Sequence, residues 1–428
     1  MFTGLLGGRR PTIKIQPYQD IFHLHPPSAH ERSHAPVTDG EEIFWGTVAL
    51  SLPSSREFDS LLVKLVGHYT LALPGHPTEI GVFGEWETNI PIPRRLDKGE
   101  HSFAWSLRIP RSSAPYERCL FGKIDYKLVA VADGPAGAIK TDRQLEVIAV
   151  PVLEAETSSL NERIEGSHQE TGPYLITLES QHLTVGGLIH FSLNFPSVPA
   201  GLRLHSITAD VVQSYALHSQ KRPGQTRSPP SHHRLLFNLD SRSLLWDETT
   251  KDDAPENAVP RRPTTILKTY PTSDPRNQGL MASLSAGGSL RISHVARLPD
   301  DYALRATTLE GTQTPIRISH TIVLDIKFSG PGADMRLLRT ERPLTLLSCG
   351  CLPDSVILPP YVDLPGRDEG EFEKRLKDGA KGTGTDDYYV CVCLYAFDTL
   401  IQPLLGAHKA HAVLSAKTDD ILAANKRS

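Results

Sequence analysis

The chain has 428 residues, of which 39% are hydrophobic and 22% are charged, and its formal net charge at pH 7 is −4. These proportions are ordinary for a soluble globular protein with about two domains and tails. The charge balance gives no indication of a nucleic-acid-binding protein or of a polybasic membrane patch.

The N-terminus and the cysteines favour a cytoplasmic protein. The first residues, MFTGLLGGRRPTIKIQP, lack the apolar core of a signal peptide. The longest apolar run, from Tyr388 to Phe397, is about half of the roughly 20 residues that a membrane helix needs. Five cysteines, an odd number in a large chain, do not suggest a disulfide framework.

Apolar and polar residues alternate with a period of two along most of the chain. The alternation is clearest in residues 60–73, 101–110 and 321–328, where every second residue is apolar. Further strands are expected to begin near Ile43, Ile124, Leu175, Ile189, Leu202, Pro315 and Leu344. Segments with the helical period of 3.6 are nearly absent, so the sequence predicts an all-β protein of antiparallel sheets.

Similar strand patterns occur in the two halves of the chain, and they predict two domains. GTVALSL from Gly46 and GGLIHFSLNF from Gly186 are each followed by a longer strand with an aromatic residue near its end. We expect an N-terminal domain over 11–150, a polar linker over 151–173, a C-terminal domain over 174–348 and a tail over 349–428. Residues 219–233 and 247–279, rich in Pro, Ser, Thr and charge, are expected to be long irregular loops.

Several of these segments resemble the arrestin family, and in particular the α-arrestins, or arrestin-related trafficking adaptors. The resemblance covers Thr12 to Tyr361 and is carried by GTVALSL with LLVKLVGHY, LDKGEHSFAWSLRIP, GKIDYKLVAVAD, YLITLESQHLTVGGLIHFSLNF, ADVVQSYAL, TPIRISHTIVLDIKF and LTLLSC with LPPY. It implies two immunoglobulin-like antiparallel β-sandwich domains in tandem, with a mostly irregular C-terminal tail. It also implies a protein without a catalytic site or cofactor that binds membrane cargo and recruits partners.

The stretch LPPY, Leu358-Pro359-Pro360-Tyr361, is the predicted binding site. WW domains recognise Pro-rich segments that already favour a polyproline II helix. Pro359 would occupy the aromatic groove of the WW domain and Tyr361 a second pocket, while Pro360 fills the variable position. The alternative is a rigid turn after a strand, with a partly buried tyrosine.

His30-Glu31-Arg32-Ser33-His34 matches the H-E-x-x-H pattern of zinc hydrolases. That chemistry needs a helix that brings both histidines onto one face. Prolines flank this short polar segment on both sides, so we interpret it as a loop between the first two strands. Metal analysis of the protein would test the zinc-hydrolase alternative.

Two cysteine pairs, Cys349 with Cys351 and Cys391 with Cys393, could supply thiolate ligands, but C-x-C is not the usual spacing of structural zinc sites. We therefore expect no metal site. Separately, Leu236 to Asp240, LFNLD, fits a loose clathrin-box pattern, although an ordinary short strand explains the same alternation and is favoured.

These observations lead to one functional expectation and one main rival. The chain would be a cytoplasmic adaptor, recruited peripherally to the plasma membrane or endosomes. It would link cytoplasmic regions of transporters or receptors to a WW-domain HECT ubiquitin ligase and so promote ubiquitination and endocytosis. Ubiquitin is a candidate covalent modification, and no nucleic acid or small-molecule substrate is expected. The rival is an arrestin-fold scaffold for endosomal sorting, of the retromer-subunit type, in which LPPY has no ligase partner.

Overall fold

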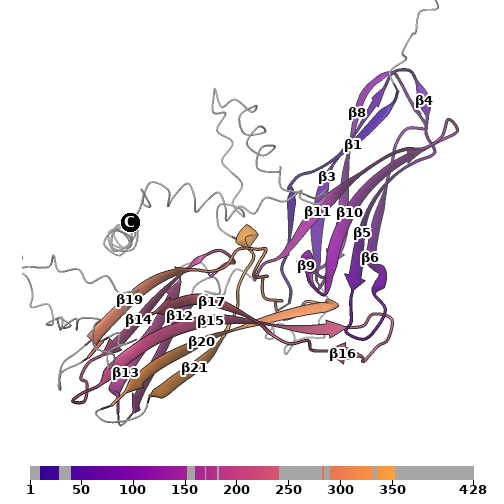
Figure 1. The fold of residues 1–428 in the computed structure, drawn as a ribbon. Helices are drawn as coiled ribbons and strands as arrows, with labels where there is room; N and C mark the ends of the chain where they lie inside the picture. The colour runs from indigo at the N-terminus through magenta and orange to yellow at the C-terminus, as the bar shows by residue number, and fades with distance from the viewer. Residues whose placement is uncertain are drawn as a thin grey trace, which may run out of the picture. The chain divides into compact units, whose positions relative to one another are not determined.

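The computed structural model describes residues 10–27, 40–151, 160–168, 170–180, 183–240, 282–283, 290–330 and 335–351. Within these ranges the chain forms β-strands and one short 3₁₀ turn, Cys349–Cys351 (η2), and no α-helix (Figure 1). All strand pairs are antiparallel except β2 with β11, which run parallel, and an isolated parallel bridge between Thr184 and Leu347. The prediction of an all-β protein with antiparallel sheets is therefore confirmed.

The chain divides into two compact units that do not follow the order of the sequence. Unit 1 comprises Met1–Ala155, Ser214–Pro230 and Thr307–Ile318, and unit 2 comprises Glu156–Gln213, Ser231–Ala306 and Ser319–Ser428. Two segments from the second half of the chain thus belong to unit 1. The predicted boundaries assigned this half to a single C-terminal block.

Unit 1 contains two main sheets of long strands (Figure 1). One has the order β1-β3-β8, formed by β1 (Thr12–Pro17), β3 (Glu41–Leu52) and β8 (Gly99–Pro110). The other has the order β2-β11-β10-β5-β6, formed by β2 (Ile21–Leu24), β11 (Ile139–Ala149), β10 (Gly122–Asp133), β5 (Ser60–Leu71) and β6 (Glu79–Ile90), with β9 (Glu117–Cys119) paired to β10. A short pair joins β4 (Arg56–Glu57) to β7 (Arg95–Leu96).

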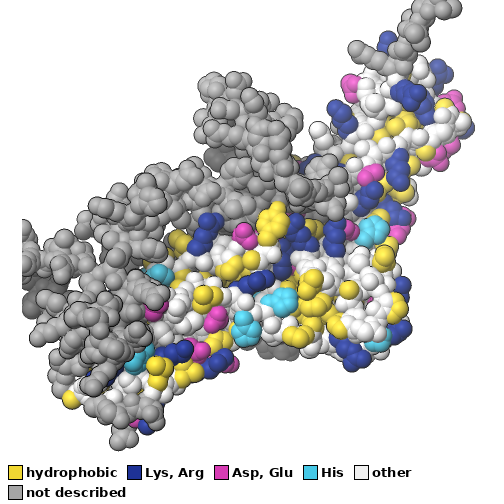
Figure 2. All heavy atoms as spheres, viewed as in Figure 1, with side chains coloured by type: hydrophobic (Ala, Val, Ile, Leu, Met, Phe, Trp, Pro, Cys, Tyr) yellow, Lys and Arg dark blue, Asp and Glu magenta, His cyan; other side chains and the backbone are white. Residues whose placement is uncertain are grey.

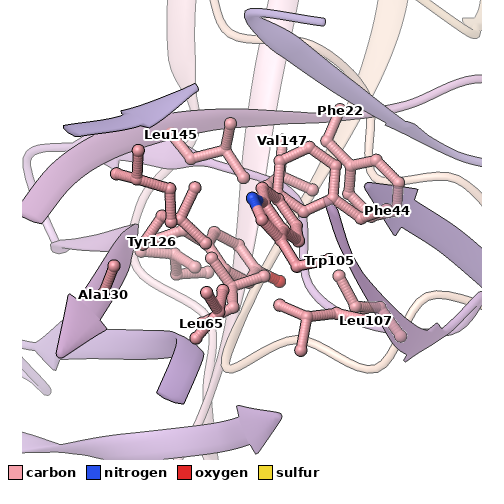
Figure 3. Packing of buried hydrophobic residues seen from close by; sticks show 14 of the residues in the cluster. Phe22, Phe44, Leu65, Trp105, Leu107, Tyr126, Ala130, Leu145 and Val147 are labelled. Carbon is pink, nitrogen blue, oxygen red and sulfur yellow. The ribbon is translucent and has the colours of Figure 1, made fainter. Parts of the chain in front are cut away.

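The alternation in the sequence builds the core of unit 1. Every second residue of β5 from Leu61 to Leu71 is buried, as the period-two pattern predicts. Phe44 of β3 lies edge-on to Trp105 of β8, with ring centroids 5.2 Å apart (Figure 3). Tyr126 of β10 is fully buried, and its hydroxyl donates to the carbonyl oxygen of Ala114 at 2.5 Å. Both sheets contribute to one apolar cluster, which is the packing expected of a β-sandwich.

Unit 2 contains a second pair of sheets around its own apolar cluster. The first has the order β12-β13-β14-β19, formed by β12 (Leu160–His168), β13 (Gly172–Ser180), β14 (Leu188–Phe195) and β19 (Leu290–Arg297). The second is built on β15 (Arg203–His218), β20 (Ile316–Ser329) and β21 (Arg336–Leu344), and β16 (Thr226–Arg227), β17 (His232–Leu239) and β18 (Ala282–Ser283) also pair with β15. Strand β16 and the ends of β15 and β20 belong to unit 1.

Three details of the predicted organisation are wrong. Residues 160–168, predicted as linker, form β12, because Leu160 and Ile164 are buried while the intervening polar residues of this edge strand face outward. Residues 219–233 are not an irregular loop: they form a hydrogen-bonded turn, β16 and the start of β17. Leu344 ends a strand instead of beginning one. The predicted loop 247–279 lies outside the described residues.

Candidate functional site

The predicted motif, Leu358-Pro359-Pro360-Tyr361, lies outside the described residues, which end at Cys351. The structure therefore does not place its side chains. It does describe how the preceding chain is attached to unit 2. Tyr361 follows Cys351 by ten residues, so it lies within about 35 Å of Cys351 even at full extension.

The chain is fixed to the core of unit 2 up to Leu347. Leu344, Leu346 and Leu347 are buried. Leu347 donates its N–H to the carbonyl oxygen of Leu183 at 3.0 Å, and its own carbonyl accepts from Val185 at 2.9 Å. The turn η2 follows directly, held by a 3.0 Å bond from the Cys351 N–H to the Ser348 carbonyl. The last described contacts therefore lie just before the segment that carries the motif.

Cys349 and Cys351 lie in this turn as thiols and are not joined in a disulfide. Burial, together with the neighbouring Cys349, raises the pKa of Cys351 to about 12, although a hydrogen bond from the backbone at Ser348 opposes the shift. The neutral thiol is thus favoured at pH 7. No group of three or more His, Cys, Asp or Glu residues with metal-site geometry occurs within the described part of the chain. Cys391 and Cys393 lie outside it, as do His30, Glu31 and His34.

His30 and His34 lie in the sequence between β2 and β3, so the segment that contains them follows the second strand. The prediction that it separates the first two strands is wrong, because the alternation of TIKIQP and IFHL already forms β1 and β2 before it.

Most of Leu236 to Asp240 is part of strand β17, as favoured over the clathrin-box interpretation. Phe237 and Leu239 are buried, and the Phe237 ring packs 5.2 Å from that of Phe191. The apolar residues that a clathrin-box ligand would have to expose are committed to the core of unit 2.

A buried polar cluster in unit 2 was missed by the sequence reasoning. The Gln213 side-chain oxygen accepts from the Arg305 N–H at 2.7 Å and lies 3.0 Å from Nε2 of His320. Because this oxygen is an acceptor, Nε2 of the neutral imidazole must be the donor. The Arg305 guanidinium in turn donates to the carbonyl and the carboxylate of Asp301.

Burial lowers the pKa of His320 to about 4, so the imidazole is neutral at pH 7. Through Gln213 and His320, the network therefore connects the segment around Arg305 to strands β15 and β20. A signal was present in the sequence: Gln213 lies in the inward row of β15 with Val211 and Leu217, where an apolar residue is expected.

A second polar cluster lies in unit 1, where Glu79 at the start of β6 holds a turn. Its buried carboxylate accepts from Ser219 Oγ at 2.6 Å, the Gln220 N–H at 3.1 Å and the Lys221 N–H at 3.4 Å. Burial alone would raise the pKa of Glu79, but these hydrogen bonds and the nearby Lys221 charge outweigh it and lower the pKa. The carboxylate is charged at pH 7 and fixes the turn 219–222.

The histidine at position 76 reinforces this attachment from the β5–β6 turn. Its ring nitrogens lie 3.1 Å from the Arg222 guanidinium and 2.7 Å from the Gln225 side-chain amide. Position 79 is the first residue of a strand and position 219 the first of a stretch rich in Pro and Ser, so no local pattern links them. Their contact depends on the tertiary structure.

No family model and no curated protein sequence matches this chain. No helix among the described residues combines the length and the apolar character needed to cross a membrane.

Proposed function

We propose that this chain is an arrestin-like adaptor that links membrane cargo to a WW-domain HECT ubiquitin ligase. In this proposal the two units are immunoglobulin-like sandwiches of an arrestin fold, and they supply the surface for cytoplasmic regions of transporters or receptors. Leu358, Pro359 and Tyr361 supply the ligase contact. Cargo ubiquitination, endocytosis and protein transport follow from bringing the two together at the plasma membrane or at endosomes.

The observation that carries the proposal is where the described contacts of unit 2 end along the chain. The hydrogen bonds and buried side chains of the last sheet end at Leu347, and the sequence LPPY begins eleven residues later. A Pro-rich segment that follows a stable β body closely in sequence suits a WW domain, because prolines reduce the order that has to be imposed on binding. The four main β-sheets of the described residues, which surround two separate apolar clusters, support the adaptor body.

The test is capture of purified WW domains by the full chain, with Tyr361→Ala as the variant. Removing an aromatic anchor typically costs about 2 kcal/mol or more, which is over tenfold in affinity. Pro360→Ala is the matched control, since the variable position should tolerate alanine with little loss. LPPY is the only such motif in the sequence, so no second site could restore binding through avidity.

Two results would contradict the proposal. If wild-type protein binds no WW domain but binds an endosomal coat complex, the sorting-scaffold alternative is favoured. If Tyr361→Ala lowers the melting temperature strongly, Tyr361 is a buried structural residue and LPPY is not an exposed ligand.

A further inference from the structure

We propose that one end of unit 1, defined here as the basic tip, docks on anionic membrane surfaces. The basic tip consists of the turn 219–225 with Arg227 of β16, the β5–β6 turn 72–78 with the start of β6, and the β9–β10 turn at Leu120 and Phe121. This inference deepens the proposed function by naming the surface that recruits the protein to a bilayer. Its test needs neither cargo nor ligase.

Hydrogen bonds and packing bring the three turns together. The Ala72 N–H donates to the Phe121 carbonyl at 2.8 Å, which joins the β5–β6 turn to the β9–β10 turn. The Phe121 ring lies 4.9 Å from that of Tyr215 on β15. The contacts of Glu79 and His76 described above attach the turn after β15 to the same end of the sheet.

The basic tip carries an unbalanced positive charge. Residues 214–230 contain Lys221, Arg222 and Arg227 and no acidic residue. Arg222 and Arg227 make no ion pair with a carboxylate in the part of the chain that is described, and the Glu79 charge is buried beneath the turn. The pKa of His218 is lowered by burial and by the positive charge of Arg317, as expected where cations gather. In Figure 2, basic and hydrophobic side chains gather at the end where Figure 1 draws β16.

Apolar side chains project from the same end. Cys119 pairs with Gly122, so Leu120 and Phe121 form a two-residue turn, in which Phe121 packs inward and Leu120 is 78% exposed. Ile80 and Val82, near the start of β6, are 67% and 50% exposed. A leucine at the tip of so tight a turn can enter the headgroup region of a bilayer without any change in the fold.

The chemistry favours a lipid surface over a peptide. Exposed apolar side chains beside lysine and arginine are what interfacial binding requires, since the charges attract anionic headgroups and the apolar groups leave water. The apolar residues come from a turn and a separate strand, and none of the described contacts forms a lined groove around them. The whole-chain charge of −4 hides this local surplus.

The test is sedimentation of the full chain with vesicles of phosphatidylcholine alone or with 30% phosphatidylserine (roughly the anionic fraction that gives a negative surface potential). We expect binding only to the anionic vesicles, and weaker binding as salt rises. Replacing Lys221, Arg222 and Arg227 together by Ser should weaken that binding about a hundredfold. Leu120→Ser should weaken it about tenfold.

The matched control replaces Arg94, Arg95 and Lys98 by Ser, which changes the net charge equally. These exposed residues follow the far end of β6, a strand of 12 residues and hence about 40 Å. The control variant should bind vesicles as the wild type does. Tyr361→Ala should also bind them normally, so loss of vesicle binding is distinguishable from loss of WW-domain binding.

The membrane proposal is wrong if anionic vesicles do not bind, or if both triple variants lose binding equally. It is also wrong if soluble polyglutamate binds through the same three residues while vesicles do not, because the basic tip would then be a site for acidic peptides. Melting temperatures check that the variants fold.

Discussion

His320 occupies an inward position of β20, in a row that is otherwise apolar. Its pKa in the folded protein is about 4, against an ordinary value of 6.5, because burial disfavours the imidazolium. Between these two pH values the unfolded chain binds more protons than the folded one. Stability from this residue is therefore complete above about pH 6.5 and is lost as the pH falls towards 4, by about 3 kcal/mol at most.

The prediction for this residue is a flatter pH profile in His320→Gln. Glutamine keeps a donor for the Gln213 oxygen but cannot be protonated. Chemical unfolding at pH 4.5, 5.5 and 7 should show a steep loss of unfolding free energy in the wild type and a shallower one in the variant. Equal slopes would mean that His320 is not the group that titrates.

At the residue scale, the sequence predicts burial better than polarity. The alternation of apolar residues correctly predicts which side chains of β5 and β8 face the core, since transfer of apolar side chains from water dominates their placement. Gln213 and His320 break such rows. Their mutual hydrogen bond depends on two strands about 100 residues apart in sequence, so pattern reasoning on either strand alone could not find it.

At the element scale, the turn after β15 depends on Glu79. In Glu79→Ala, the Ser219 hydroxyl and the amides of Gln220 and Lys221 lose their acceptor, which costs about 1–3 kcal/mol. Hydrogen exchange at these two amides should rise at least tenfold. Glu87→Ala, an exposed change on the same strand, is the control and should leave the exchange unaltered.

Acid should open the same turn. The pKa of Glu79 is lowered in the fold, so its contribution to stability is present above about pH 4.5 and is lost as the pH falls below that value. Hydrogen exchange at the Gln220 and Lys221 amides measures this opening as the pH is lowered. If exchange at these amides is unchanged in Glu79→Ala, the backbone pairing of β15 with β16 is sufficient to hold the turn.

Strands could be predicted from the sequence where one face of the strand is buried and the other is exposed to solvent. β12 was not, because its two buried side chains, Leu160 and Ile164, are too few to show a period among polar residues. The turn 219–225 was mistaken for an irregular loop because the composition signals of Pro, Gly and Lys do not reveal a carboxylate contributed by a distant strand. The placement of LPPY stays a prediction.

At the scale of the whole molecule, unit 1 is completed by distant parts of the sequence. Tyr215, Leu217, Ile316 and Ile318 are buried in its apolar cluster, although they belong to the second half of the chain. The sequence suggested two consecutive blocks, since nothing in the period of a strand indicates which core its last residues will enter. Folding of unit 1 therefore requires long-range contacts as well as its own strands.

The corresponding prediction is that residues 1–155 do not fold stably as a fragment. Without the segments 214–230 and 307–318, the apolar side chains that pack against Leu217 and Ile316 would be exposed to water. The fragment should bind a hydrophobic dye and melt with low cooperativity. In the full chain, Leu217→Ala should lower the stability of unit 1 by about 2–5 kcal/mol, because it opens a cavity in a closed core. Leu239→Ala, a comparable change in the core of unit 2, separates a local effect from a general one. A fragment that melts as sharply and as high as unit 1 of the full chain would show that the distant segments only cover a core which is already complete.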